Sequence, residues 1–130
     1  MKYKITLEEA GILAVFEGNL DTADIKNCII EIQANEKYSE YEYGIFDYTK
    51  ADLSNIEIGD VLAELFPLSI GASFSLPFAK VAIVAVDPHT VNINKSYRNK
   101  LLEFGIKWGF EIFSNQTDAR NWIDLTSRWR

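Results

Sequence analysis

The 130-residue chain has little cysteine, histidine, proline or glycine: it contains one cysteine, one histidine, three prolines and seven glycines. Because Cys28 stands alone, no internal disulfide can form, and a disulfide-built secreted scaffold is excluded. The sequence has no Cys-x-x-Cys or His-x-x-x-His spacing, so we expect neither a bound metal nor another cofactor. With 48% hydrophobic residues and few glycines and prolines, intrinsic disorder is also excluded.

Positive charge is scarce as well. Thirteen basic residues face nineteen acidic ones, giving a net charge of −6, whereas domains that bind nucleic acid are usually basic. We therefore expect no nucleic-acid partner. The second half of the chain, residues 66–130, holds eight basic and five acidic residues. These late basic side chains fit a solvated helix face, a patch for an anionic partner, or attraction between the subunits of a homodimer.

No segment fits a membrane span or a signal peptide. The longest apolar stretch, residues 61–79, is interrupted by Glu64, Pro67 and Pro77, and a spanning helix needs about 20 nearly uncharged apolar residues. We expect a cytoplasmic protein that forms one domain over residues 1–130.

Hydrophobic periodicity predicts five strands and four helices. Strands are expected at residues 2–8, 12–17, 43–48, 80–87 and 110–113, and helices at 22–36, 54–66, 90–108 and about 118–126. Ser54 and Glu57 match a capping box, so we expect a helix to begin at Ser54, and Pro67 should kink or end it. Cys28 falls inside the first helix and is expected to be buried and inert.

The element order β-β-α-β-α-β-α-β-α predicts an α/β fold. A β-hairpin opens a mixed five-stranded sheet, whose later strands run parallel and are joined by helices.

Three segments carry a resemblance to a known family. They are KVAIVAV at 80–86, FEIFSN at 110–115 and TDARNWI at 117–123, and the strand GIFD at 44–47 agrees in placement. With these segments the chain resembles the STAS-like domains (sulfate transporter and anti-sigma-factor antagonist), and most of all the stage-II-sporulation-AA-like branch. The resemblance implies a bacterial, non-enzymatic regulatory domain that binds a partner protein.

The resemblance also bears on one serine. In the anti-sigma-factor antagonists, a serine within the pattern Asp-Ser-Ser-Gly-Leu is phosphorylated by a partner kinase. The corresponding segment here is Asp52-Leu53-Ser54-Asn55-Ile56, which keeps Asp52 and Ser54 and lacks the second serine and the glycine. Phosphorylation of Ser54 is thus one interpretation and helix capping the other; Thr49 is a nearby substitute.

One candidate site follows from sheet geometry. Loops at the carboxyl ends of parallel strands gather at one edge, where ligands commonly bind, and helix N-termini there could bind an anion. The expected edge for a partner or an anion consists of Asp47, Tyr48, Thr49, Ser54, Asp87, His89 and Thr90. Ordinary turns are the alternative, since Asp87 to Thr90 also fits a turn and helix cap.

A second candidate surface is the apolar segment 66–78, which holds Phe66, Leu68, Ile70, Phe74, Leu76 and Phe78. It fits either core packing or an exposed patch that contacts a partner protein, a second copy of the chain, or a lipid or membrane surface.

Catalytic motifs are missing. There is no phosphate loop and no Gly-x-Ser-x-Gly elbow that would expose a nucleophilic serine, so we expect no enzyme. The sequence favours a regulatory or protein-interaction module; the alternative is a carrier of a small apolar ligand or lipid.

Overall fold

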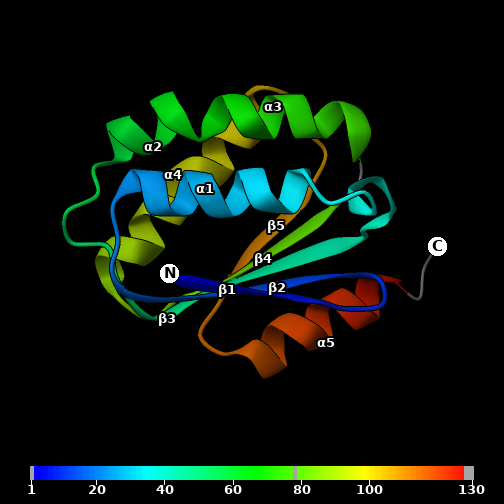
Figure 1. The fold of residues 1–130 in the computed structure, drawn as a ribbon, viewed down its shortest axis with the longest axis horizontal. Coiled ribbons are helices and arrows are strands. Elements are labelled where there is room, and N and C mark those ends of the chain that lie inside the picture. The colour runs from blue at the N-terminus through cyan, green and yellow to red at the C-terminus, as the bar shows by residue number, and fades with distance from the viewer. Residues whose placement is uncertain (1, 78, 128–130) are drawn as a thin grey trace.

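The computed structural model describes residues 2–77 and 79–127 as a five-stranded sheet with helices on both faces (Figure 1). The strands lie in the order β1-β2-β3-β4-β5; β1 is antiparallel to β2 and the other neighbours are parallel. The strands are β1 (Tyr3–Leu7), β2 (Gly11–Asn19), β3 (Tyr43–Asp52), β4 (Lys80–Val84) and β5 (Gly109–Phe113). The predicted mixed sheet and its opening hairpin are confirmed.

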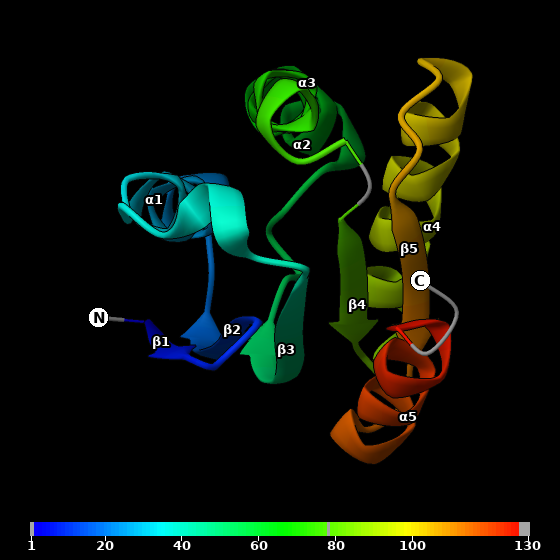
Figure 2. The same ribbon diagram turned by 90° about the vertical axis from the view of Figure 1, so that its right-hand side faces the viewer.

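Within the described residues there are five α-helices where four were expected, and one short 3-10 helix. They are α1 (Thr22–Gln33), η1 (Tyr38–Glu40), α2 (Ile58–Glu64), α3 (Phe66–Ser75), α4 (Pro88–Glu103) and α5 (Gln116–Ser127). Helices α1 to α4 cover one face of the sheet and α5 covers the other (Figures 1 and 2).

Alternation along the central strands divides the core between these two faces. In β4, Ile83 packs into the larger core beneath α1 to α4, whereas Ala82 and Val84 pack into the smaller core with Ala119 and Ile123 of α5. A central parallel strand covered on both faces reads as the continuous apolar run seen here.

The segment after β3 differs from the prediction. Ser54 does not cap a helix, because it lies in a turn closed by the hydrogen bond from the Ile56 amide to the Leu53 carbonyl, 2.9 Å. Leu53 and Ile56 are 2% and 1% exposed, and their burial fixes this turn. The helix α2 therefore begins four residues later, at Ile58.

Pro67 breaks the helical segment as predicted. It sits in the first turn of α3, where its missing amide hydrogen costs nothing, and α2 and α3 meet at an angle of 41°. Among the described residues no single helix is long and apolar enough to cross a membrane; this bent pair meets the requirement by length and composition only.

Helix α4 ends earlier than the predicted residue 108. Gly105 has φ +72, a left-handed conformation that favours glycine. The Ile106 amide there donates to the Leu101 carbonyl, 3.0 Å. The chain thus turns back toward β5 after Glu103.

Candidate functional site

The expected binding edge is only partly present, because β3 is longer than predicted. It continues to Asp52 by pairing with the end of β2, where Asn19 lies opposite Asp52. Asp47 and Tyr48 are therefore interior strand residues, 6% and 8% exposed, and their assignment to an accessible edge loop is wrong. Thr49 and Ser54 are exposed, and their phosphorylation stays a prediction.

Asp47 makes hydrogen bonds that account for its burial. Its Oδ1 accepts from the amide and the hydroxyl of Thr49, at 2.9 and 2.7 Å, and its Oδ2 accepts from Gln116 Nε2 at 2.6 Å. A buried carboxylate is tolerated when donors surround it in this way. Asp47 thus joins β3 to the start of α5 and has a structural role.

The segment from Asp87 to Thr90 is a turn and helix cap, the simpler of the two interpretations. Asp87 Oδ2 accepts from the amide of Thr90 at 3.1 Å and from its hydroxyl at 3.2 Å. Thr90 is 1% exposed, so it is not an edge residue. His89 is exposed, and its Nε2 lies 2.9 Å from the Ile56 carbonyl oxygen.

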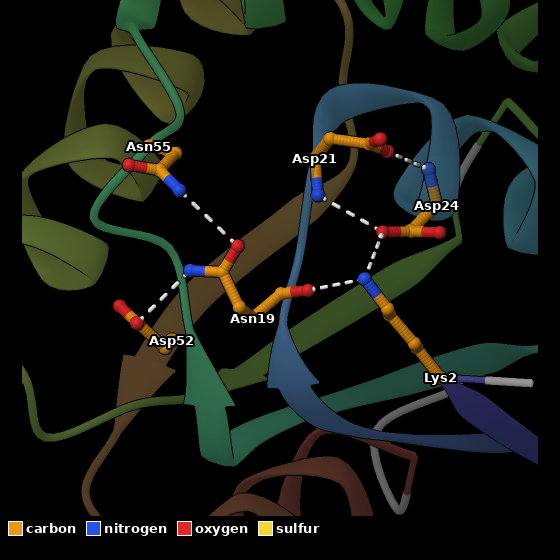
Figure 3. A network of polar contacts seen from close by, with 6 residues as sticks. All are labelled: Lys2, Asn19, Asp21, Asp24, Asp52 and Asn55. Carbon is orange, nitrogen blue, oxygen red and sulfur yellow. Dashed lines mark hydrogen bonds and ion pairs between the residues drawn. The ribbon is translucent and has the colours of Figure 1, made fainter.

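Polar residues outside the seven predicted edge residues form a network at the ends of β2 and β3 (Figure 3). Asn19 lies at its centre: its Nδ2 donates to Asp52 at 3.0 Å, and its carbonyl accepts from Lys2 Nζ at 2.6 Å. The remaining members are Asp21, Asp24 and Asn55. The pairing of Asn19 with Asp52 depends on strand register, so no local motif announces it.

This network does not favour an anion. Asp21 and Asp24 form a capping box at the start of α1. The Asp21 carboxylate accepts a hydrogen bond from the Asp24 amide, so this amide is not free to bind an anion. The Asp21 amide lowers the pKa of Asp24, and the Ser54 amide lowers the pKa of Asp52, which keeps both carboxylates ionised. Their charge would repel an incoming phosphate.

The apolar segment 66–78 divides between core and surface. Phe66 is buried, at 4% exposure, which contradicts its assignment to an exposed patch. Phe74 is 83% exposed, as a partner-binding patch requires. Leu68, Ile70 and Leu76 are half-buried, and Phe78 lies outside the described residues.

A cavity of about 140 Å³ lies between the sheet and helices α1, α3 and α4. Carbon atoms form most of its wall, and neither Phe66 nor Phe74 belongs to its lining. Its wall includes Ile12, Ile25, Ile29, Ile32, Phe46, Tyr48, Leu53, Val61, Leu65, Ala72, Val81, Ile83, Ile93, Tyr97, Trp108 and Phe110.

Several polar side chains of this wall have hydrogen-bond partners within the protein. The hydroxyls of Ser69 and Tyr97 form a hydrogen bond, and Trp108 Nε1 donates to the Leu76 carbonyl. Burial raises the pKa of Tyr97 to about 12, so its hydroxyl is neutral at physiological pH. Tyr41, also in the wall, is 8% exposed, and its hydroxyl has no hydrogen-bond partner within residues 2–77 and 79–127.

No metal-binding cluster emerges from the described part of the chain. It contains no group of three His, Cys, Asp or Glu side chains placed to hold a metal. The Cys28 thiol is fully buried, and burial raises its pKa to about 12. A thiol in this state is a poor nucleophile.

Comparison with known proteins supports the fold. No family model matches the chain, and no curated protein is significantly similar to it in sequence. One similar solved structure is an uncharacterised DUF3478-family protein with a SpoIIAA-like fold from Shewanella loihica PV-4; it is 13% identical, with 93% of this chain and 91% of that chain covered and a TM-score of 0.57. Another is the anti-sigma factor antagonist SpoIIAA in its unphosphorylated form, 12% identical, with 94% and 97% covered and a TM-score of 0.52. The chain therefore has the SpoIIAA-like, STAS-like fold that its sequence predicts.

Proposed function

We propose that this chain is a non-enzymatic domain that binds a small apolar molecule in the cavity between its sheet and helices. The observation that carries the proposal is the cavity itself, about 140 Å³ and lined mainly by aliphatic and aromatic side chains. Protein interiors are normally packed as densely as organic crystals, with few voids larger than a water molecule. An apolar cavity of about 150 Å³ can bind benzene, so a ligand of one ring fits this volume.

The ligand proposal is tested with toluene, which can make no strong hydrogen bond. We expect saturable shifts in the methyl NMR signals of Ile12, Ile83 and Ile93, which line the cavity. The methyl signals of Ile30, which is 45% exposed, serve as the internal control. Shifts at Ile30 alone, or none at all, would contradict the proposal.

A cavity-filling variant gives an independent test. Ala72 is 7% exposed and belongs to the cavity wall, so Ala72→Leu places three carbons in the space the ligand would occupy. We expect it to abolish toluene binding and to stabilise the empty protein by about 1 kcal/mol. The matched control is Ala63→Leu on the exposed side of α2, which should leave binding unchanged. Normal toluene binding in Ala72→Leu would place the ligand elsewhere.

A second candidate function is regulation through a cytoplasmic partner protein, as the name of the anti-sigma factor antagonist with the same fold suggests. The observation favouring it is the α3 patch, which we define as Ile70, Phe74 and Phe104. Phe74 and Phe104 are 83% and 56% exposed, and they line a surface groove with Ile70. Exposed aromatic side chains of this kind are enriched where proteins bind one another.

This second function is tested with Phe74→Asp. Because Phe74 is mostly exposed, stability should change by less than about 0.5 kcal/mol, while co-purification of a partner should be lost. The control is Leu7→Asp, since Leu7 is 55% exposed and lies on the opening hairpin. Light scattering of the same proteins tells a homodimer from a monomer with an external partner. Equal partner recovery with Phe74→Asp and wild type would overturn the candidate.

A further inference from the structure

One residue of the cavity wall carries a buried polar group that lacks a partner among the described residues. The Tyr41 side chain is more than nine-tenths buried in the cavity wall, and its hydroxyl has no hydrogen-bond partner among the described residues. Leaving a buried hydroxyl unpaired costs a folded protein about 1–3 kcal/mol. A ligand atom that pairs with this hydroxyl would recover that cost upon binding.

The backbone on both sides of Tyr41 fixes the position of this hydroxyl. The Tyr41 amide donates to the Tyr38 carbonyl at 3.2 Å, where η1 ends, and the next amide, of Glu42, donates to the Ala10 carbonyl at 2.6 Å. The rings of Tyr38 and Tyr41 also meet edge to face, 6.4 Å apart. Tyr41 is thus held in place before a ligand enters, which lowers the entropy cost of binding.

The protonation of Tyr41 fits a neutral hydrogen bond. Burial, and next the nearby Glu40 carboxylate, raise the pKa of the Tyr41 hydroxyl above its ordinary value of 10.0. The group therefore keeps its proton at physiological pH, and it can donate a hydrogen bond or accept one.

The cavity wall offers little to balance a ligand charge. Among the described residues its lining includes no carboxylate, and Lys80 is the one charged residue there. The stem of that side chain packs beside Gly109 and near Trp122, toward the face covered by α5. A charge placed in an apolar cavity without a partner is strongly disfavoured, so the ligand should be neutral.

Aromatic side chains form much of the same wall, from β3, α4 and the segment through β5: Phe46, Tyr48, Tyr97, Trp108 and Phe110. Aromatic rings prefer edge-to-face or offset contacts with other rings, and these contacts add to the effect of area burial. A flat ring is therefore a better match to this wall than an aliphatic chain of equal volume.

We propose that the cavity binds a neutral aromatic molecule with one hydrogen-bonding atom, which pairs with the Tyr41 hydroxyl. This inference rests on the proposed apolar-ligand function and adds the chemistry of the ligand to it.

The test compares toluene, phenol and benzoate at pH 7 in the wild type and in Tyr41→Phe. At this pH phenol is neutral and benzoate is charged. Affinities are measured by NMR titration of the cavity methyl groups. Because toluene and phenol differ in how well water solvates them, the decisive quantity is their affinity ratio within each protein. We expect Tyr41→Phe to shift this ratio about fivefold in favour of toluene, the value of one neutral hydrogen bond.

The matched control is Tyr38→Phe, which removes the hydroxyl of the neighbouring cavity tyrosine and should leave the ratio unchanged. A ratio that is the same in Tyr41→Phe and wild type would overturn the inference, as would benzoate binding as tightly as phenol. Should Tyr41→Phe fail to fold, contacts between phenol and the Tyr41 ring, seen as nuclear Overhauser effects in the wild type, decide the matter; their absence overturns the inference.

The two proposals fail differently in this experiment. Absence of toluene binding to the wild type removes the apolar-ligand function and this inference with it. Toluene binding without the Tyr41-dependent ratio removes the inference alone.

Discussion

Arg120 and Glu8 form a two-fold hydrogen-bonded ion pair that joins the opening hairpin to the last helix. Arg120 Nη1 lies 3.0 Å from Glu8 Oε1, and Nη2 lies 2.8 Å from Oε2. The Tyr43 hydroxyl also donates to Glu8, so the contact spans the hairpin turn, β3 and α5. A parallel pair of hydrogen bonds between guanidinium and carboxylate is the geometry in which such a pair is strongest.

The first prediction concerns the pH dependence of this pair. The hydrogen bond from Arg120 lowers the pKa of Glu8 from its ordinary 4.5. The ionised carboxylate therefore stabilises the fold above about pH 4.5, and this contribution is lost as the pH falls through the lowered pKa. We expect Glu8→Gln to reduce the free energy of unfolding by about 1 kcal/mol at pH 7, since both side chains remain partly exposed.

Urea unfolding at pH 7 and at pH 3 measures this change. The difference between Glu8→Gln and wild type should narrow at the lower pH. The control is Glu9→Gln, because Glu9 is the exposed neighbour. A difference equal at both pH values would contradict the role given to the ionised carboxylate.

The second prediction concerns Gly11, which packs against Tyr43 of the same contact. A Cβ atom at Gly11 would lie 2.4 Å from the Tyr43 carbonyl oxygen and 2.7 Å from its ring. Backbone cannot yield as a flexible side chain does, so Gly11→Ala should destabilise by about 1–3 kcal/mol. The control is Gly71→Ala in α3, where a Cβ meets nothing within 4 Å. Because alanine favours a helix more than glycine does, this variant should be more stable than wild type by as much as about 1 kcal/mol. Thermal unfolding of both variants should show a lower melting temperature for Gly11→Ala and a higher one for Gly71→Ala. Equal changes in melting temperature would contradict the close packing at Gly11.

The third prediction separates a structural Asp47 from a functional one. Its carboxylate accepts three hydrogen bonds, from two groups of Thr49 and from Gln116. An asparagine amide has a single oxygen acceptor, so Asp47→Asn should leave buried donors unpaired and destabilise by about 1–3 kcal/mol. Exposed Asp124 provides the control, as Asp124→Asn. Urea unfolding measures both; wild-type stability in Asp47→Asn would return Asp47 to the list of binding residues.

One strand was predicted well from the sequence and the end of another was not, and the difference has a physical cause. The strand β4 at Lys80–Val84 was predictable, although the prediction of 80–87 ran three residues too far, because its apolar run is local and belongs to a strand buried on both faces. The end of β3 was not, because the residues TKAD at 49–52 become strand through pairing with the extended end of β2. The register between these strands shifts between Val15 and Glu17, and nothing in either segment alone announces it.

The capping box at Ser54 shows the limit of a short motif. Ser-x-x-Glu is satisfied by the sequence, yet the burial of Leu53 and Ile56 fixes a turn at the same place. Tertiary packing thus overrides the local capping motif.

The cavity could not be predicted for a different reason. Most residues of its wall are apolar, as ordinary core residues are, so nothing in the sequence marks them as lining a cavity. The role of Tyr41 could not be predicted either. It lies in a tyrosine-rich stretch, and the sequence does not show that its hydroxyl is buried without a partner.

The fourth prediction concerns the reactivity of Cys28, which lies in α1 with no exposed surface. Burial raises the pKa of its thiol from 9.0 to about 12, so at pH 8 the reactive thiolate is about a thousandfold scarcer than for an exposed cysteine. Iodoacetamide at pH 8 should therefore leave the native protein unlabelled over minutes. In 8 M urea the same reagent should alkylate one site, as mass spectrometry would show. Rapid labelling of the native protein would mean that α1 opens readily over the core, and the wall that α1 contributes to the cavity would then be mobile.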